Sequence, residues 1–172
     1  MGETYKTPER ISQFITWNEA TKSSTAIKFS IANQPTEDQF KNMRYTGLNL
    51  FDPLRLNFGI PIGITSMFRS QELNEKIGGA KSSQHLANNG AAIDIDADMY
   101  GGVSNIEIFN YIKDHLVFDQ LIAEFIQGNQ PAWIHVSLKQ KKNRNEILIA
   151  TKQASNTIYI DYTNEIFNII YG

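Results

Sequence analysis

The stretch Ala91-Ala92-Ile93-Asp94-Ile95-Asp96 combines the pattern of a buried strand with two acidic residues. Side chains alternate across a strand, so Asp94 and Asp96 point to the same face of an otherwise hydrophobic segment. Acidic residues are unfavourable inside a strand unless a metal ion, a buried arginine or a hydroxyl network stabilises them. A surface turn that begins near Asp96 is the commoner explanation of such a run. The stretch therefore predicts a strand and leaves the role of its acids open.

The segments before this strand are predicted to contain helices. Residues 36–58 carry apolar residues at spacings of three and four, which indicates one face of a helix. Pro53 lacks a backbone donor and clashes with the preceding turn, so we expect a kink there or two helices that meet near Asp52. Residues 60–66 alternate as a strand, and residues 71–77 form a short capped helix.

The segments after it are predicted to be mostly strands. Helices are expected at residues 105–116 and at the end of the chain, residues 164–171. Between them lie four expected strands, at residues 118–125, 133–138, 146–151 and 157–162. The second and third of these are predicted to form a hairpin, with a solvated basic turn over residues 139–145. Helices first and strands later predict the α+β class, with N-terminal helices packed on a small, mainly antiparallel sheet.

Length and composition restrict the class of protein. The 172 residues form one ordinary domain, 1–172, with a motif-bearing core at about residues 36–151. A hydrophobic fraction of 41% and a charged fraction of 20% exclude wholesale disorder and a coiled coil. The formal net charge is −2, so a general attraction to nucleic acid or to a membrane surface is not expected. No stretch reaches the roughly 20 apolar residues of a membrane span, and residues 1–10 show no secretory signal.

The absence of cysteine restricts the chemistry further. It excludes disulfides, thiolate zinc sites and cysteine nucleophiles, so a metal ion must be held by His, Asp or Glu. Catalytic zinc prefers three protein ligands and an open fourth position for water. The simplest such set consists of His85, in a polar loop, with Asp94 and His135. Because these ligands carry a single negative charge, the bound metal keeps a net positive charge and lowers the pKa of its water. Spacing alone does not establish this set, because His135 lies far along the chain.

Seven short motifs follow one another between residues 60 and 137. They are Ile64-Thr65-Ser66-Met67-Phe68-Arg69-Ser70, Leu73-Asn74, Gly78-Gly79-Ala80, Ser83-Gln84-His85, Gly90-Ala91-Ala92-Ile93-Asp94, Phe118-Asp119-Gln120-Leu121-Ile122 and Trp133-Ile134-His135-Val136-Ser137. The ordered set resembles the zinc D-Ala-D-Ala carboxypeptidase and murein endopeptidase family (metallopeptidase family fifteen), in particular its small phage or bacterial endolysin-like branch. The resemblance implies a DD-peptidase or hedgehog-like fold with one zinc ion.

The resemblance also implies the metal ligands. His85 and Asp94 match the family pattern S-x-H-x-x-G-x-A-x-D, and His135 in the W-x-H-x-S strand would be the third ligand. The family places the first two ligands seven residues apart, whereas here the insertion within residues 86–90 makes the separation nine. Asn-Gly is a strong turn signal, so the extra residues can bulge outward. If they do not, Asp96 competes with Asp94.

Three further residues are expected to bind substrate. The resemblance implies this role for Arg69 and Ser83, and Trp133 shares the strand face of His135. Arg69 matches an arginine that holds the substrate carboxylate and polarises the scissile region, which would make it a catalytic as well as a binding residue. The role suits the guanidinium fork, and a surface ion pair is the alternative. Ser83 would bind substrate or orient the site, and otherwise caps a loop turn. Trp133 would form the floor of the substrate groove or pack in the core.

The general base departs from the usual pattern. Many family members carry Asp or Glu three residues before the third ligand, and this chain has Ala132 there. The expected replacement is Glu124, with Asp119 as the alternative, since a carboxylate of suitable pKa can take a proton from water and pass it to the leaving amine. Whether Glu124 and His135 face the same side depends on strand register, which the sequence does not determine.

These observations predict a zinc-dependent peptidase that hydrolyses a peptide bond in bacterial peptidoglycan, of the D-Ala-D-Ala carboxypeptidase or murein endopeptidase type. We expect a monomer that acts on the stem peptide, without nucleic acid or membrane partners. It would stay in the cytoplasm until lysis, or reach the cell wall by means outside this chain. Ala132 leaves open an impaired peptidoglycan-binding or phage structural module that keeps the fold. The pair Asp94 and Asp96 leaves open a two-metal phosphoesterase.

Overall fold

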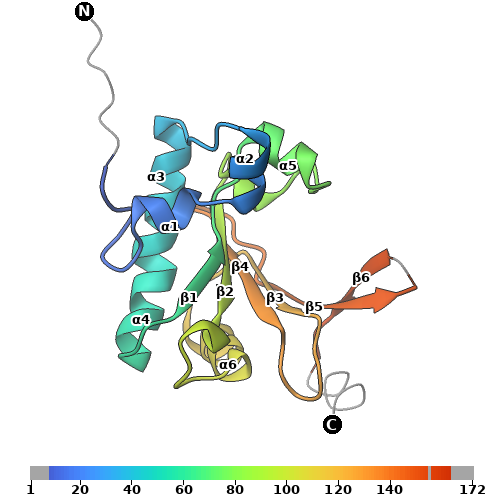
Figure 1. Ribbon diagram of the computed structural model, residues 1–172. Coiled ribbons are helices and arrows are strands. Elements are labelled where there is room, and N and C mark those ends of the chain that lie inside the picture. The colour runs from blue at the N-terminus through green and yellow to red at the C-terminus, as the bar shows by residue number, and fades with distance from the viewer. Residues whose placement is uncertain (1–7, 155, 164–172) are drawn as a thin grey trace, which may run out of the picture.

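A six-stranded sheet forms the centre of the computed structural model, which describes residues 8–154 and 156–163 (Figure 1). In spatial order the strands are β1 (Gly63–Ser66), β2 (Ala91–Asp96), β4 (Trp133–Leu138), β3 (Gln120–Glu124), β5 (Glu146–Gln153) and β6 (Asn156–Asp161). Neighbouring strands are antiparallel except β3 and β5, which are parallel. The α+β class and the mainly antiparallel sheet are therefore confirmed.

The predicted hairpin between β4 and β5 is wrong. Both edges of β4 are already paired, with β2 and with β3, and β5 pairs instead with β3 and β6. The connection between β4 and β5 is held at Asp119, whose side chain accepts a hydrogen bond from the Arg144 N–H at 3.0 Å. The Asp119 carbonyl accepts a second one from the Glu146 N–H at 3.1 Å. These bonds place the start of β5 beside the start of β3.

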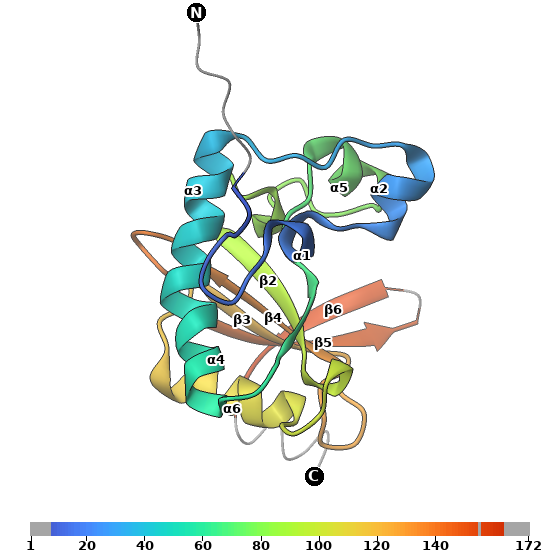
Figure 2. The same ribbon diagram turned by 60° about the vertical axis from the view of Figure 1, so that its left-hand side comes forward.

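The part of the chain that the structure describes also contains six helices and three short helical turns. The helices are α1 (Trp17–Thr21), α2 (Ser24–Phe29), α3 (Glu37–Thr46), α4 (Asp52–Phe58), α5 (Gln71–Lys76) and α6 (Asn105–His115). The turns are η1 (Gly47–Phe51), η2 (Gln84–Leu86) and η3 (Ala97–Met99). Figure 2 shows α3 and α4 running in line across the sheet, with β5 and β6 extending away from them. No described helix is long and apolar enough to cross a membrane.

The alternation of side chains gives the sheet two different faces. The residues directed toward α3 and α6 are fully buried and apolar: Ile93, Ile95, Leu121, Ala123, Ile134 and Val136. Burial of this kind is the main favourable contribution to folding. Their neighbours Asp94, Glu124 and His135 point to the opposite face. The helices therefore cover one face, and the polar residues gather on the other.

Pro53 is accommodated without a break between helices. A capping box between Thr36 and Gln39 begins α3, and the helix widens into a π-helical turn at η1 before α4 begins at Asp52. The widened turn η1 directly precedes Pro53, the second residue of α4, so the regular α-helical hydrogen-bond pattern is already altered where Pro53 lacks its N–H. We expected a kink or a junction of two helices near Asp52. The structure has a widened turn within a continuous helix there instead. Of the other predicted elements, β1 is shorter than residues 60–66, and the helix expected at 164–171 lies outside the described residues.

Candidate metal centre

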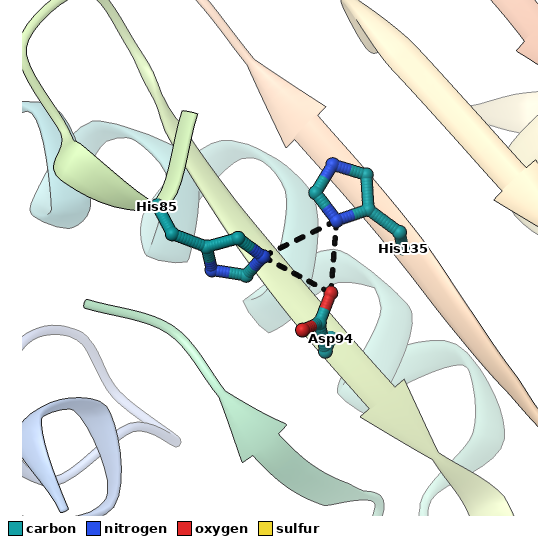
Figure 3. Close-up of side chains that lie close together, drawn as sticks. All are labelled: His85, Asp94 and His135. Atoms are coloured by element: carbon teal, nitrogen blue, oxygen red, sulfur yellow. Dashed lines mark hydrogen bonds and ion pairs between the residues drawn. The ribbon is translucent and has the colours of Figure 1, made fainter. Parts of the chain in front are cut away.

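Three elements bring His85, Asp94 and His135 together (Figure 3). Asp94 and His135 are directly paired on the antiparallel strands β2 and β4, so their side chains lie next to each other on one face. His85 comes from η2, a turn that the Ser83 side chain begins by accepting a hydrogen bond from the His85 N–H at 3.4 Å. The structure therefore joins a loop and two strands at one point.

The three potential ligand atoms lie close enough to share one ion. The distance from His85 Nε2 to Asp94 Oδ1 is 3.1 Å, and that from His135 Nδ1 to the same oxygen is 2.8 Å. The two imidazole nitrogens are 3.3 Å apart. Ligands about 2.0–2.1 Å from a tetrahedral zinc ion are separated by roughly 3.3 Å, so these separations fit such an ion.

The protonation of His85 supports a cation at this point. Its Nδ1 lies 2.8 Å from the carbonyl oxygen of Met67, and because a carbonyl oxygen only accepts, Nδ1 carries the hydrogen. Burial lowers the pKa of His85 and favours the neutral ring, although the charge of Asp94 opposes this. The bare Nε2 therefore faces a carboxylate oxygen. A metal ion between the two acceptors would satisfy both of them.

Arg69 orients the aspartate. Its Nη2 donates to Asp94 Oδ2 at 2.9 Å, and its Nε donates to Ser66 Oγ at 3.2 Å. Burial raises the pKa of Asp94, but the two histidines outweigh burial and hold that pKa well below its ordinary range. Asp94 is therefore an anion that offers Oδ1 to an ion while Arg69 holds Oδ2. The surface ion pair considered as the alternative role of Arg69 is not found, since its ion pair is with Asp94 inside the site.

One cavity of about 920 Å³ joins the residues proposed from the sequence. It is lined, among others, by Arg69, Ser83, His85, Asp94, Glu124, Trp133 and His135. The roles assigned to them remain predictions, but their common location is an observation. A concave site of this size that holds convergent polar groups is the usual form of an active site.

The register of β3 and β4 places Glu124 on the side of His135. Glu124 pairs with Trp133, and Ile122 pairs with His135, so all four side chains face the cavity. Only 7% of Glu124 is exposed. Burial raises the pKa of Glu124 to about 7, with His135 lowering it and Asp94 raising it. A carboxyl group of this pKa exchanges protons readily near neutral pH.

Asp96 lies outside the candidate metal centre. Its Oδ1 accepts hydrogen bonds from the Asp98 N–H at 3.0 Å and from Asn105 Nδ2 at 3.3 Å, so it caps the turn η3. The insertion is absorbed in a bend over residues 87–90, where Ala87 and Gly90 adopt positive φ angles of 54° and 87°. Asp94 thus reaches the histidines despite the longer spacing. Within the described residues, the group that could hold a metal ion contains Asp94 and not Asp96.

Asp119 is engaged in a separate buried network. Its side chain is fully buried and lies 3.0 Å from Lys139 Nζ and 2.6 Å from Arg144 Nη2. Although burial raises its pKa, hydrogen bonds from Arg144 and Lys139 hold the pKa of Asp119 at about 2. A permanently charged, fully paired carboxylate is unsuited to proton exchange, so the geometry favours Glu124 as the base. The basic turn at residues 139–145 is anchored to this network by Lys139 and Arg144. Most of its residues are exposed, as predicted, so only its role as a hairpin tip is wrong.

This network reaches both histidines through their neighbours in the chain. Gln84 Nε2 donates to Asp119 Oδ2 at 3.1 Å, and Gln84 Oε1 accepts from Ser137 Oγ at 2.7 Å. Gln84 precedes His85, and Ser137 follows His135 by two residues. The network therefore connects η2 to β4 at the edge of the cavity.

Asp119→Ala is expected to destabilise the fold by about 3 kcal/mol, because it leaves Lys139 and Arg144 without their buried partner. The lowered pKa adds a pH signature with a defined sign. The stability contributed by Asp119 is present above its ordinary pKa and is lost as the pH falls toward about 2, so the variant should lose less stability between pH 5 and pH 2. Urea denaturation across this pH range measures both effects.

The control for this experiment is Asp114→Ala. Asp114 pairs with its neighbour Lys113 at 3.0 Å and its side chain is 53% exposed. Loss of such a surface pair should change stability by less than about 1 kcal/mol. Equal effects of the two substitutions would contradict the buried network.

Sequence reasoning missed three groups at the site. Met67 and Gln84 lie within two of the seven short motifs, residues 64–70 and 83–85. Their place in these motifs is the only feature of the sequence that could have indicated a role at the site. Tyr159 also lines the cavity, from β6. Nothing local marked it, because β6 reaches the site only through the parallel pairing of β5 with β3.

A histidine–aspartate–histidine cluster in a sheet cavity beside a buried glutamate is an arrangement that suits a metal-dependent hydrolytic site. Comparison with known families agrees, since the family model of Peptidase M15 matches residues 13–137, which include all four of these residues. The chain belongs to the peptidase M15 family and is a metallopeptidase, as the motifs indicated. No curated protein gave a significant match.

Proposed function

We propose that this protein is a zinc-dependent peptidase that hydrolyses a peptide bond in bacterial peptidoglycan. The observation that carries the proposal is the convergence of His85, Asp94 and His135, whose ligand atoms lie 2.8–3.3 Å apart in the cavity. Two imidazoles and one carboxylate suit a single zinc ion. When bound there, zinc polarises the scissile carbonyl group and acidifies water. Membership of the M15 family supports both the metal and the wall substrate.

Glu124 is proposed as the group that moves the proton. Its carboxylate takes a proton from the attacking water as the water oxygen bonds to the carbonyl carbon. The same proton then passes to the amide nitrogen as the C–N bond breaks, so the carboxylate is regenerated. The raised pKa of Glu124 and its place on the face of His135 support this role.

The remaining cavity residues are proposed to bind the stem peptide. Arg69 keeps Asp94 in place and directs the rest of its guanidinium toward substrate oxygens, which matches its chemistry. Trp133, whose ring lies 5.2 Å from that of Phe125, offers an aromatic wall. Ser83 holds the turn that carries His85 and lines the same cavity. We further propose a monomer of the endolysin-like branch that acts in the cell wall after lysis or export.

Removal of the metal is expected to abolish the reaction. Purified muropeptides should be cleaved by the zinc-loaded protein, left intact after chelation, and cleaved again after zinc is restored. Mass spectrometry of the products measures this and separates loss of a terminal D-Ala from cleavage within a cross-link. Cleavage that persists in the chelated protein would refute a metallopeptidase. Binding without cleavage would indicate the impaired binding module, and two metal ions per chain would indicate the phosphoesterase.

A further inference from the structure

The strands β5 and β6 add to the cavity from outside the matched family segment. That segment ends at residue 137, and β5 begins at Glu146. Because β5 pairs with β3, the β5–β6 pair extends the sheet on the side of Glu124, away from the helices (Figure 1). The Phe125 N–H donates to the Ala150 carbonyl at 2.9 Å and ties the end of β3 to β5.

The register brings Tyr159 into line with Glu124. Glu124 pairs with Ala150, and Ala150 pairs with Tyr159, so the three side chains form one row on the cavity face. Adjacent strands are about 4.8 Å apart, which separates Tyr159 and Glu124 by roughly 10 Å at the backbone. The residue between them has only a methyl group. No large side chain of this row therefore stands between Tyr159 and Glu124, and both residues line the cavity.

The hydroxyl group of Tyr159 is available to a ligand. Tyr159 is 56% exposed, and among the described residues no hydrogen bond joins its hydroxyl to another group. Burial of part of the ring, followed by the charges of Glu124 and Asp94, raises the pKa of Tyr159. The phenol therefore stays protonated and can donate a hydrogen bond at neutral pH.

We propose that Tyr159 contacts the substrate and donates a hydrogen bond to a backbone carbonyl oxygen of the bound peptide on the Glu124 side of the cavity. The inference rests on the proposed function, because it takes the wall peptide as the ligand. It assigns substrate binding to β6, a strand outside the family match.

The test compares Tyr159→Phe, which removes only the hydroxyl, with Tyr159→Ala, which removes the ring as well. Tyr159→Phe should raise KM for a disaccharide-pentapeptide muropeptide roughly three- to tenfold, as expected for one lost neutral hydrogen bond, with little change in kcat. Tyr159→Ala should raise it further. Binding of the same muropeptide, measured by calorimetry in a Glu124→Gln background that suppresses turnover, should weaken in parallel. Tyr100→Phe is the matched control, since Tyr100 is 60% exposed and lines a different cavity.

The outcomes separate this inference from the proposed function. If the unsubstituted protein cleaves the muropeptide and Tyr159→Phe matches it in KM and affinity, Tyr159 only covers the sheet and the inference is overturned. If the unsubstituted protein binds without cleaving and Tyr159→Phe binds more weakly, the inference holds while the peptidase function fails. If the unsubstituted protein neither binds nor cleaves, both fall. Unchanged zinc content and melting temperature in the Phe variant show that the fold is intact.

Discussion

Asp94→Ala is expected to lower zinc affinity by more than about 100-fold and to abolish muropeptide hydrolysis. Loss of a residue that merely supports a metal ligand costs 10- to 100-fold in affinity, so loss of a ligand itself should cost more. The substitution removes the oxygen that lies 3.1 Å from His85 Nε2 and 2.8 Å from His135 Nδ1. It also frees Arg69 from its only carboxylate partner in the described residues. Zinc content after dialysis and the rate of muropeptide cleavage measure the two effects.

Asp96→Ala is the matched control, because Asp96 lies two residues further along and outside the candidate metal centre. Zinc content and rate should be retained. A stability loss of about 1 kcal/mol is expected, since Asp96 caps η3. The reverse result, with zinc lost in Asp96→Ala and kept in Asp94→Ala, would show that the insertion shifts the ligand to Asp96.

Glu124→Gln is expected to reduce kcat by about 10²–10⁴-fold while zinc binding is retained. The amide has the shape of the carboxyl group but cannot accept the proton from water. Glu124 lies outside the group that could hold the metal, so zinc content should not change. Because burial disfavours the charged carboxylate, the neutral amide should not weaken the fold. Glu72→Gln, on the exposed surface of α5, controls for the change in charge.

The pH profile gives this prediction a second measurement. The pKa of Glu124 is raised to about 7, and a general base acts in its deprotonated form. Activity should therefore be present at high pH and fall as the pH decreases through that pKa. This decrease forms the acidic limb of the pH–activity profile. A bound cation stabilises the carboxylate, so the midpoint of the limb is expected at a pH of about 7 or below. The residual activity of Glu124→Gln should lack this limb, and a limb that persists there would belong to another group.

Elements with strong local signals were predicted closely. The bounds of β2 and β4 agree with the sequence pattern, and α5 is capped as expected, by Ser70. Capping and alternation involve residues only a few positions apart, so they can be recognised in the sequence. The insertion before Asp94 was likewise interpreted correctly as a bend, because Asn-Gly has a defined turn chemistry.

Pairings between distant segments were not predicted. The polar turn after β4 suggested a hairpin because its local composition suits one, but the buried carboxylate of Asp119 draws Arg144 and the start of β5 to β3. That attraction depends on burial, which sequence composition does not reveal. Asp119 was accordingly considered as a base when its surroundings make it a structural anchor.

The sequence by itself determined the chemistry that is available: no thiol, two histidines and an aspartate in recognisable motifs, and a glutamate where the usual base is missing. Only the tertiary structure decided which of these groups meet. Asp94 and His135 are paired, Glu124 shares their face, and Tyr159 joins them from β6. The physical reason is the two-residue repeat of a strand, in which a shift of one position turns every side chain to the opposite face. The packing of the whole sheet against its helices determines the register, and the register determines which side chains face the cavity.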